Sequence, residues 1–159
     1  MSIDAPIRIT LEQDGDYAFR IGFQGTGLNP LLTDEPPPLG QDQGPNPARL
    51  LLASIANCLA ASLVFALRKF RNAPDPIRAE ICATPVRNEE GRWRIASAKA
   101  TLHLPGSNAD YKGLDRVFSQ FEDFCVVTQS VRQGIDVDVV VKDGAGRVLM
   151  GDKSFEAGA

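Results

Sequence analysis

Alternating apolar and polar residues predict a β-hairpin at the start of the chain. Residues 7–12 (IRITLE) and 16–24 (DYAFRIGFQ) alternate on either side of Asp14 and Gly15, a pair that favours a tight turn between strands. Residues 26–47 are rich in Pro and Gly and read as a long irregular loop. Loops of this length in a compact domain are often functional.

The second half of the chain carries a similar alternation. Residues 77–84 (IRAEICAT) and 92–104 (RWRIASAKATLHL) alternate around a charged turn at 89–91, and they predict a second antiparallel pair. Residues 135–141 (IDVDVVV) form an alternating strand. A turn starting at Asp143 and Gly144 then leads the chain back towards Met150.

Helical spacing fills the intervals between these strands. A helix over about 47–71 begins with Asn46 as N-cap and Pro47 as first helical residue. Apolar residues between 111 and 121 fall at helical spacing, and a short helix follows over 126–133. The order β-β-α-β-β-α-α-β-β predicts an α+β fold with mainly antiparallel pairing, in one domain over residues 1–159.

The centre of the long helix is apolar enough to raise the question of a membrane span. Residues 50–67 carry no charge, and fifteen of the eighteen are apolar. Their length is close to the lower limit for spanning about 30 Å of hydrocarbon. Five of them are Ala, however, and strand-like segments without an aromatic belt flank the helix. The pattern favours a central helix covered on most faces, and in so small a protein a second subunit is the expected cover.

Composition points to a cytoplasmic globular protein. The chain has 159 residues, a net charge of −3, 43% hydrophobic and 23% charged residues, which suits a soluble domain with a real core. The only basic run is the short RKFR at 68–71, so we expect no nucleic-acid partner. The N-terminus does not resemble a secretory signal, and three cysteines do not make a disulfide framework. We therefore expect a reducing cytosol and no membrane partner.

The three cysteines receive three interpretations. Cys82 lies in a predicted strand and is expected to be a buried structural thiol. Cys58 shares a helix face with small residues, which would give a substrate access to its sulfur or simply let two helices pack closely. Cys125 precedes the short helix, whose N-terminus stabilises a thiolate, but Glu122 and Asp123 oppose that effect. Cys125 is thus a usable thiol and a poor first nucleophile, or a structural residue.

Other chemistry has few candidates. His103 is the single histidine and lies in a strand pattern. A half-exposed strand residue is a simpler interpretation of it than a catalytic base. The chain has no CxxC motif, so we predict neither a thioredoxin-like motif nor a metal site. The glycines near residue 25 lead into a Pro-rich loop and not into a helix, which argues against a phosphate loop.

Two segments resemble a known family. Residues 44–70, GPNPARLLLASIANCLAASLVFALRKF, are similar to the NPxxLLxxxxxxC segment of the OsmC/Ohr family, the organic hydroperoxide resistance proteins. Residues 124–141, FCVVTQSVRQGIDVDVVV, resemble the family's second cysteine segment, in which a cysteine begins a short helix that leads into a strand. The order of elements fits this family over essentially the whole chain.

The resemblance implies an OsmC-like fold, in which antiparallel sheets wrap around a long central helix in an intertwined homodimer. It also implies thiol-dependent reduction of organic hydroperoxides. Cys58 would attack the peroxide and become a sulfenic acid, and Cys125 would condense with it to a disulfide. An external dithiol, lipoyl-linked in the Ohr branch, would reduce that disulfide. The resemblance calls for no metal, haem or flavin cofactor.

The sequence departs from the family at the residues that would activate the thiol. Members carry a Glu directly after the helix-opening Pro, and this position is Ala48 here. They also carry an Arg from the N-terminal strands, for which Arg20 is the candidate. Arg49 and Glu35 are the charged residues that could replace the missing group, and solvated surface charges are the alternative for all three. Val126 follows Cys125 where Pro is common.

The leading hypothesis is therefore a cytoplasmic, homodimeric thiol peroxidase that acts on organic hydroperoxides. Because Ala48 replaces the family Glu, the alternative is a non-enzymatic dimeric protein of the same fold that binds a small apolar ligand. A third interpretation, a Cys–His hydrolase, requires His103 close to a cysteine.

Overall fold

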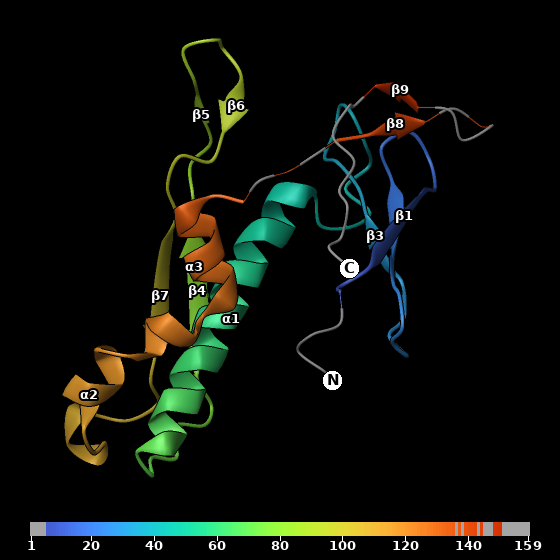
Figure 1. Ribbon diagram of the computed structural model, residues 1–159. Coiled ribbons are helices and arrows are strands. Elements are labelled where there is room, and N and C mark those ends of the chain that lie inside the picture. The colour runs from blue at the N-terminus through green and yellow to red at the C-terminus, as the bar shows by residue number, and fades with distance from the viewer. Residues whose placement is uncertain (1–5, 136, 138, 143, 145–147, 151–159) are drawn as a thin grey trace.

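The computed structural model describes residues 6–135, 137, 139–142, 144 and 148–150. A long helix, α1 (Pro47–Lys69), runs through the molecule, with a two-stranded sheet and the later helices on one side and the N-terminal strands on the other (Figure 1). The architecture is α+β with antiparallel sheets, as predicted. The strands are β1 (Ile9–Gln13), β2 (Phe19–Phe23), β3 (Leu31–Thr33), β4 (Arg78–Cys82), β5 (Val86–Arg87), β6 (Trp93–Arg94), β7 (Lys99–His103), β8 (Val141–Lys142) and β9 (Val148–Met150). The helices after α1 are η1 (Asn108–Asp110), α2 (Leu114–Phe118), η2 (Phe121–Phe124) and α3 (Val126–Gln133).

The predicted N-terminal hairpin is confirmed. Strands β1 and β2 pair antiparallel with Ile9 opposite Phe23, and the Asp14 N–H donates to the Ala18 carbonyl at 2.8 Å to close the turn. Gly15 in this turn has a φ of 132°, in a region that side chains disfavour. Strand β3 extends the sheet on the other edge of β2. It lies inside the segment that the sequence predicts to be irregular.

The rest of that loop is held by one buried carboxylate. Asp34, which is 3% exposed, accepts hydrogen bonds from the backbone N–H groups of Gln41 at 2.9 Å and Gln43 at 3.2 Å. A Cβ added at Gly40 would lie only 2.2 Å from the Asp34 carboxylate, so the loop closes too tightly for any side chain there. The Pro-rich segment between β3 and α1 is therefore an ordered connection.

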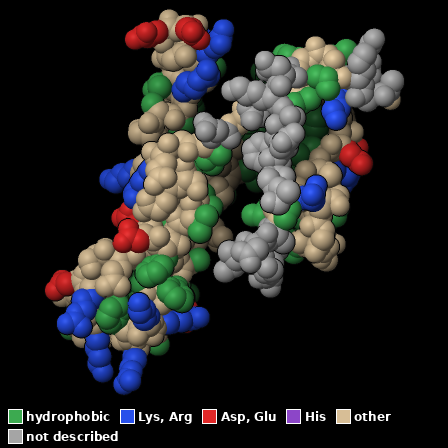
Figure 2. All heavy atoms as spheres, in the orientation of Figure 1, with side chains coloured by type: hydrophobic (Ala, Val, Ile, Leu, Met, Phe, Trp, Pro, Cys, Tyr) green, Lys and Arg blue, Asp and Glu red, His purple; other side chains and the backbone are tan. Residues whose placement is uncertain are grey.

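Helix α1 begins as its sequence predicts. The Asn46 side-chain oxygen accepts a hydrogen bond from the Arg49 N–H at 3.0 Å, and Pro47 takes the first helical position, where its missing N–H costs nothing. Arg68 and Lys69 occupy the last turn, where cations complement the helix dipole. Figure 2 shows Lys and Arg side chains gathered at this end of the molecule.

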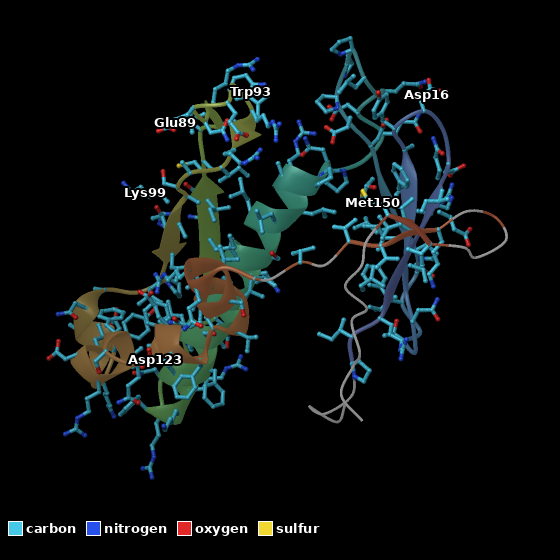
Figure 3. The ribbon with its side chains drawn as sticks, turned by 45° about the horizontal axis from the view of Figure 1, so that its top comes forward. Asp16, Glu89, Trp93, Lys99, Asp123 and Met150 are labelled. Carbon is cyan, nitrogen blue, oxygen red and sulfur yellow. The ribbon has the colours of Figure 1, made fainter. Side chains whose placement is uncertain are left out.

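The second predicted hairpin is split into two pairs of strands. Strands β4 and β7 pair antiparallel and pack against α1, whereas β5 and β6 form a small separate hairpin. Pro85 stands between β4 and β5 and has no N–H to continue a ladder. Figure 3 shows Glu89 and Trp93 at the tip of this outer hairpin.

The helical spacing over 111–121 resolves into shorter pieces. Helix α2 ends at Phe118, and the 3₁₀ turn η2 begins at Phe121. A buried amide ties this region to the end of α1. Asn72 accepts a hydrogen bond from the Lys112 N–H at 2.7 Å, and it donates to the Lys112 carbonyl at 3.0 Å and to the Leu67 carbonyl at 3.2 Å. The predicted short helix at 126–133 is confirmed as α3, and Gly134 ends it with a φ of 79°.

Two apolar clusters make up the core, and both are built on α1. The first contains Leu63, Ala66, Leu67 and Val117 and fixes α2 under the C-terminal half of the helix. The second contains Ile55, Leu59 and Cys125 and fixes α3 and the β4–β7 sheet to the middle of the helix. The surface of α1 beside Cys58 stays partly open in the single chain, since Leu51 is 40% and Phe65 is 57% exposed.

The last strands differ from the prediction. Residues 135, 137, 139 and 140 lie outside any strand, and the strand expected over 135–141 is observed only from Val141, in β8. Strand β8 pairs antiparallel with β9, so the chain does turn back. Residues 136, 138, 143 and 145–147, which complete the predicted strand and turn, lie outside the described residues.

Candidate functional site

Cys58 occupies the middle of α1 on the face that meets α3 and the β4–β7 sheet. It packs against the cluster formed by Ile55, Leu59 and Cys125, and its side chain is only partly buried. One turn later, Ser62 lies on the same face and is 6% exposed. The Ser62 hydroxyl acts to lower the pKa of both Cys58 and Cys125. The helix thus presents one accessible sulfur beside one buried hydroxyl.

Cys125 is the N-cap of α3 and is fully buried, with 0% exposure. Its backbone is fixed on both sides, because its N–H donates to the Glu122 carbonyl at 3.0 Å and its carbonyl accepts from the Gln129 N–H at 3.0 Å. The sulfur lies 3.0 Å from the Thr128 hydroxyl oxygen. Figure 3 shows Asp123 on the turn just before this helix.

The structure brings the two predicted cysteines together at the start of α3. Cys58 packs against the buried cluster that contains Cys125, and each thiol shifts the pKa of the other. Cys125 is itself the N-cap residue of α3, so the pair lies at the start of this helix. All three cysteines of the chain are free thiols.

The two thiols differ in acidity. Burial raises the pKa of Cys58, and the neighbouring Cys125 raises it further, against the opposing hydrogen bonds from Val127 and Ser62. Burial also acts to raise the pKa of Cys125, but the hydrogen bonds from Cys58, Thr128 and Ser62 outweigh it and lower that pKa. A shared negative charge therefore rests on the buried sulfur. The sequence predicts opposing effects on the acidity of Cys125, but it does not reveal the contributions of the Thr128 and Ser62 hydroxyls.

An apolar pocket of about 310 Å³ lies near this pair, and neither cysteine is part of its lining. Its walls come from α1, the β4–β7 sheet, η2 and α3, and Thr128 connects it to Cys125. Glu122 and Arg132 stand at the same pocket and form an ion pair with a 2.5 Å contact. The apolar residues of the lining are Ile55, Leu59, Ile81, Ala98, Ala100, Leu102, Phe121 and Val131. Such a lining suits an apolar ligand group.

The charged candidates lie elsewhere in the single chain. Arg20 pairs with Asp14 across the N-terminal hairpin at 2.7 Å, and Arg49 pairs with Asp42 at 2.5 Å. Glu35 accepts a hydrogen bond from the Asn46 side chain at 3.2 Å and so supports the start of α1. Each of the three has a partner in its own neighbourhood. The ion pair that does lie near the cysteines is Glu122 with Arg132. In the sequence, only their positions before and after Cys125 could have indicated it.

Two expectations about single residues are settled by the β4–β7 sheet. Cys82 is exposed, so the prediction of a buried thiol is wrong: Ile81 takes the inward position of β4, and alternation turns Cys82 outward.

His103 lies at an outward position of β7, 3.6 Å from Glu80, whereas its neighbour Leu102 packs towards the cysteines. This places His103 on the sheet face opposite to Cys58 and Cys125, which removes the geometry that a Cys–His hydrolase requires.

Sequence reasoning also missed the two hydroxyls that hold the sulfurs. Ser62 follows Cys58 by four residues and Thr128 follows Cys125 by three, which are the spacings of side-chain neighbours on a helix. Among the residues that the structure describes, no three His, Cys, Asp or Glu side chains gather as a metal site would need.

Comparison with known proteins identifies the fold. The family model described as "OsmC-like protein" matches residues 40–140, which contain α1, both site cysteines and the β4–β7 sheet. A search of curated proteins found no match.

Solved structures of this family resemble the chain at low sequence identity. An OsmC-like protein of unknown function from Vibrio cholerae superposes with a TM-score of 0.63 at 13% identity, over 79% of this chain and 93% of that one. The organic hydroperoxide resistance protein OhrB of Bacillus subtilis gives 0.60 at 17% identity, over 84% and 95%. An organic hydroperoxide resistance protein from Elizabethkingia anophelis gives 0.60 at 18% identity, over 86% and 95%. In this shared fold the long apolar helix is the core helix, although it is long and apolar enough to cross a membrane.

Proposed function

The chain belongs to the OsmC-like protein family, and from this premise we propose that it is a thiol peroxidase that reduces organic hydroperoxides to alcohols. The observation that carries the proposal is the packing of Cys58 against the buried cluster that contains Cys125, the N-cap residue of α3. Two structural neighbours are named organic hydroperoxide resistance proteins, and this supports the same chemistry here.

Accessibility assigns the order of the two thiols. Cys58 is the partly exposed sulfur and Cys125 is covered, so the peroxide meets Cys58 first. The raised pKa keeps Cys58 protonated at rest, so its attack requires an uphill transfer of that proton to the neighbouring Cys125 thiolate as the peroxide arrives. The Cys58 thiolate attacks the outer peroxide oxygen, the O–O bond breaks, and the alkoxide leaves as an alcohol after protonation.

The second half of the cycle uses the contact between the sulfurs. The Cys125 sulfur attacks Cys58 in its sulfenic acid form, the S–S bond forms, and the S–O bond breaks with release of water. An external dithiol then reduces the disulfide and is itself oxidised. The apolar pocket beside the pair would hold the organic part of the peroxide.

A second copy of the chain completes the proposed enzyme. The open face of α1, with Leu51 and Phe65, is apolar and lies on the element that carries Cys58. A homodimer in which two α1 helices pack together would cover it. The charged candidates Arg20, Glu35 and Arg49 have no contact with the cysteines in one chain, so a role for any of them in activating Cys58 rests on a contribution from the partner. Free cysteines in the described protein suit the reducing cytoplasm.

The test is turnover of cumene hydroperoxide or tert-butyl hydroperoxide with dihydrolipoamide or dithiothreitol as donor. The protein and its Cys82→Ser variant are expected to consume peroxide at equal rates, since Cys82 lies on the other face of the sheet. The Cys58→Ser variant is expected to be inactive. If the unchanged protein shows no turnover above Cys58→Ser with either donor, the proposal is wrong.

The pocket favours one alternative function, the binding of a small apolar ligand without chemistry. Ala48 stands where the family Glu is expected, and this supports the same alternative. Saturable binding of an apolar fluorescent probe that Ala100→Phe abolishes, together with thiols that stay reduced under peroxide, would establish the binding protein in place of the peroxidase.

A further inference from the structure

Thr128 stands out among the residues around the cysteine pair because its hydroxyl faces only one of the two sulfurs. Thr128 is 6% exposed and lies in the first turn of α3, with its Oγ1 3.0 Å from the Cys125 sulfur. A hydroxyl rotates to suit its neighbour: it accepts from a thiol and donates to a thiolate. Ser62, by contrast, acts on the pKa of both thiols in the same direction and so does not distinguish them.

The surroundings of the two sulfurs are unequal in a way that matters for a disulfide. Cys125 is 0% exposed and lies beneath α1 and α3, whereas Cys58 is only partly buried. An external dithiol therefore reaches the Cys58 sulfur. Attack on that sulfur makes Cys125 the leaving group, and a thiol leaves faster when its thiolate is stabilised.

We propose that Thr128 is a positioning residue that holds Cys125 as the leaving thiolate when an external dithiol opens the Cys58–Cys125 disulfide. The proposal rests on the peroxidase function in assuming that this disulfide forms. One donor thiolate bonds to the Cys58 sulfur, the S–S bond breaks, and its electron pair departs on Cys125 towards the Thr128 hydroxyl and N–H. The second donor thiol then displaces Cys58, so the donor leaves as a disulfide and both cysteines are reduced.

The pKa of Cys125 agrees with this role. Burial raises it, yet the side chain and backbone of Thr128 contribute to the hydrogen bonds that lower it overall. Removal of the hydroxyl is expected to raise the pKa of Cys125 and to destabilise the reduced protein relative to the disulfide. A hydrogen bond to a charged group would give about a three- to tenfold effect on the rate of reduction, since only part of the charge has formed in the transition state.

The experiment compares Thr128→Val, which keeps the shape and loses the hydroxyl, with Thr128→Ser, which keeps the hydroxyl. The disulfide is formed with diamide, so the measurement does not depend on any peroxide activity. Reduction by dithiothreitol is followed as a function of pH, and the reduction potential is measured against the same donor. We expect Thr128→Val to be reduced about three- to tenfold more slowly, with a more negative potential whose pH dependence changes slope at a higher pH. Thr128→Ser is expected to match the unchanged protein.

The proposal is overturned if Thr128→Val keeps the rate, the potential and the pH profile of the unchanged protein. A structural effect alone would lower the thermal stability of Thr128→Val without moving the potential in this direction, and that result would also overturn it.

A second measurement needs no variant. The oxidised protein is treated with a monothiol, quenched with acid and mapped by mass spectrometry; the mixed disulfide is expected on Cys58, and a mixed disulfide on Cys125 would refute the assignment of the leaving group. Failure of the peroxidase assay with success of this test would mean that the pair is redox-active but peroxide is not its oxidant.

Discussion

The cysteine pair and the N-terminal sheet differ in how completely a single chain buries them. Around the pair, α1, α3 and the β4–β7 sheet bury Cys125 completely, and the Thr128 hydroxyl is its hydrogen-bond partner. In the β1–β3 sheet, Ile9 is 46% and Leu11 is 58% exposed, and the main contacts of the strands are with each other. Figures 1 and 2 show this sheet apart from the lobe that holds the pair.

This difference teaches which part of the protein depends on a partner. A few strands with little apolar burial gain little stability from pairing alone. Exposed apolar side chains on this sheet and at Phe65 of α1 make a surface that suits a partner. In the proposed enzyme, one chain assembles the cysteine pair, and a second copy covers the sheet and the open surface of α1.

The largest expected effect lies in the complete region. Leu67 is 0% exposed in the core under α1, so Leu67→Ala should lower the free energy of unfolding by about 2–5 kcal/mol. Leu28 is 65% exposed before β3, and Leu28→Ala should cost less than about 0.5 kcal/mol. Urea denaturation at one protein concentration measures both. Equal losses for the two variants would contradict the core assignment.

The next effect concerns dimerisation through the open surface of α1. Phe65 is 57% exposed in one chain, with its ring 5.5 Å from that of Phe124. If a second copy covers it, Phe65→Asp removes about 1.5–3 kcal/mol of burial and weakens dimerisation about tenfold or more. Sedimentation equilibrium gives the dissociation constant. Val86→Asp, on the outer β5–β6 hairpin, is the control and should leave that constant unchanged; dimerisation that survives Phe65→Asp would place the interface elsewhere.

A smaller effect is expected where the two regions are joined. Asn46 caps α1 and also donates to Glu35, on the loop that leads from β3. Asn46→Ala should lower stability by about 1 kcal/mol, and Asn46→Ser should restore most of the loss because its hydroxyl also caps a helix. Both are compared in urea denaturation. If Asn46→Ser loses as much stability as Asn46→Ala, the helix cap does not account for the effect.

The smallest effect concerns pH in the N-terminal loop. The hydrogen bond from the Gln41 N–H, opposed by burial and helped by the N–H groups of Gln43 and Glu35, lowers the pKa of Asp34 from its ordinary value. A carboxylate with a lowered pKa stabilises the fold above the pH where the unfolded group titrates, and this contribution is lost as the pH falls through the folded pKa. The protection of the Gln41 and Gln43 amides, relative to their intrinsic exchange rates, should therefore fall as acid protonates Asp34. In Asp34→Asn the protection should not follow that titration; the same acid-induced loss of protection in Asp34→Asn would refute this prediction.

Much of the fold could be predicted from sequence because its signals are local. The Asn46 cap, Pro47 and the turn at Gly15 each specify backbone geometry within a few residues. Strand β3 was missed because its neighbours are Pro-rich and its order comes from pairing with β2 and from the buried Asp34 carboxylate. The helical pattern over 111–121 was too long because Asn72, forty residues earlier, fixes the chain at Lys112.

The site was less predictable, since it joins elements that are far apart in the chain. Cys58 and Cys125 could be paired only through the resemblance of both segments to a known family. Cys82 was misjudged because alternation alone does not say which face of a strand is buried, and Ile81 claimed the inner face. Ser62 and Thr128 stand at helical spacing from the cysteines, but their importance depends on which thiol lies opposite them.

The most direct test of the central claim, that Cys58 and Cys125 are one redox pair within a single chain, is intact-mass analysis after one equivalent of cumene hydroperoxide. The unchanged protein and Cys82→Ser should each lose about 2 Da per chain, as one disulfide forms and two hydrogens leave. Cys125→Ser should instead gain about 16 Da as a sulfenic acid that a dimedone trap captures, and Cys58→Ser should not change. Thiols that keep their mass under peroxide, or a disulfide that persists in Cys58→Ser, would contradict the account.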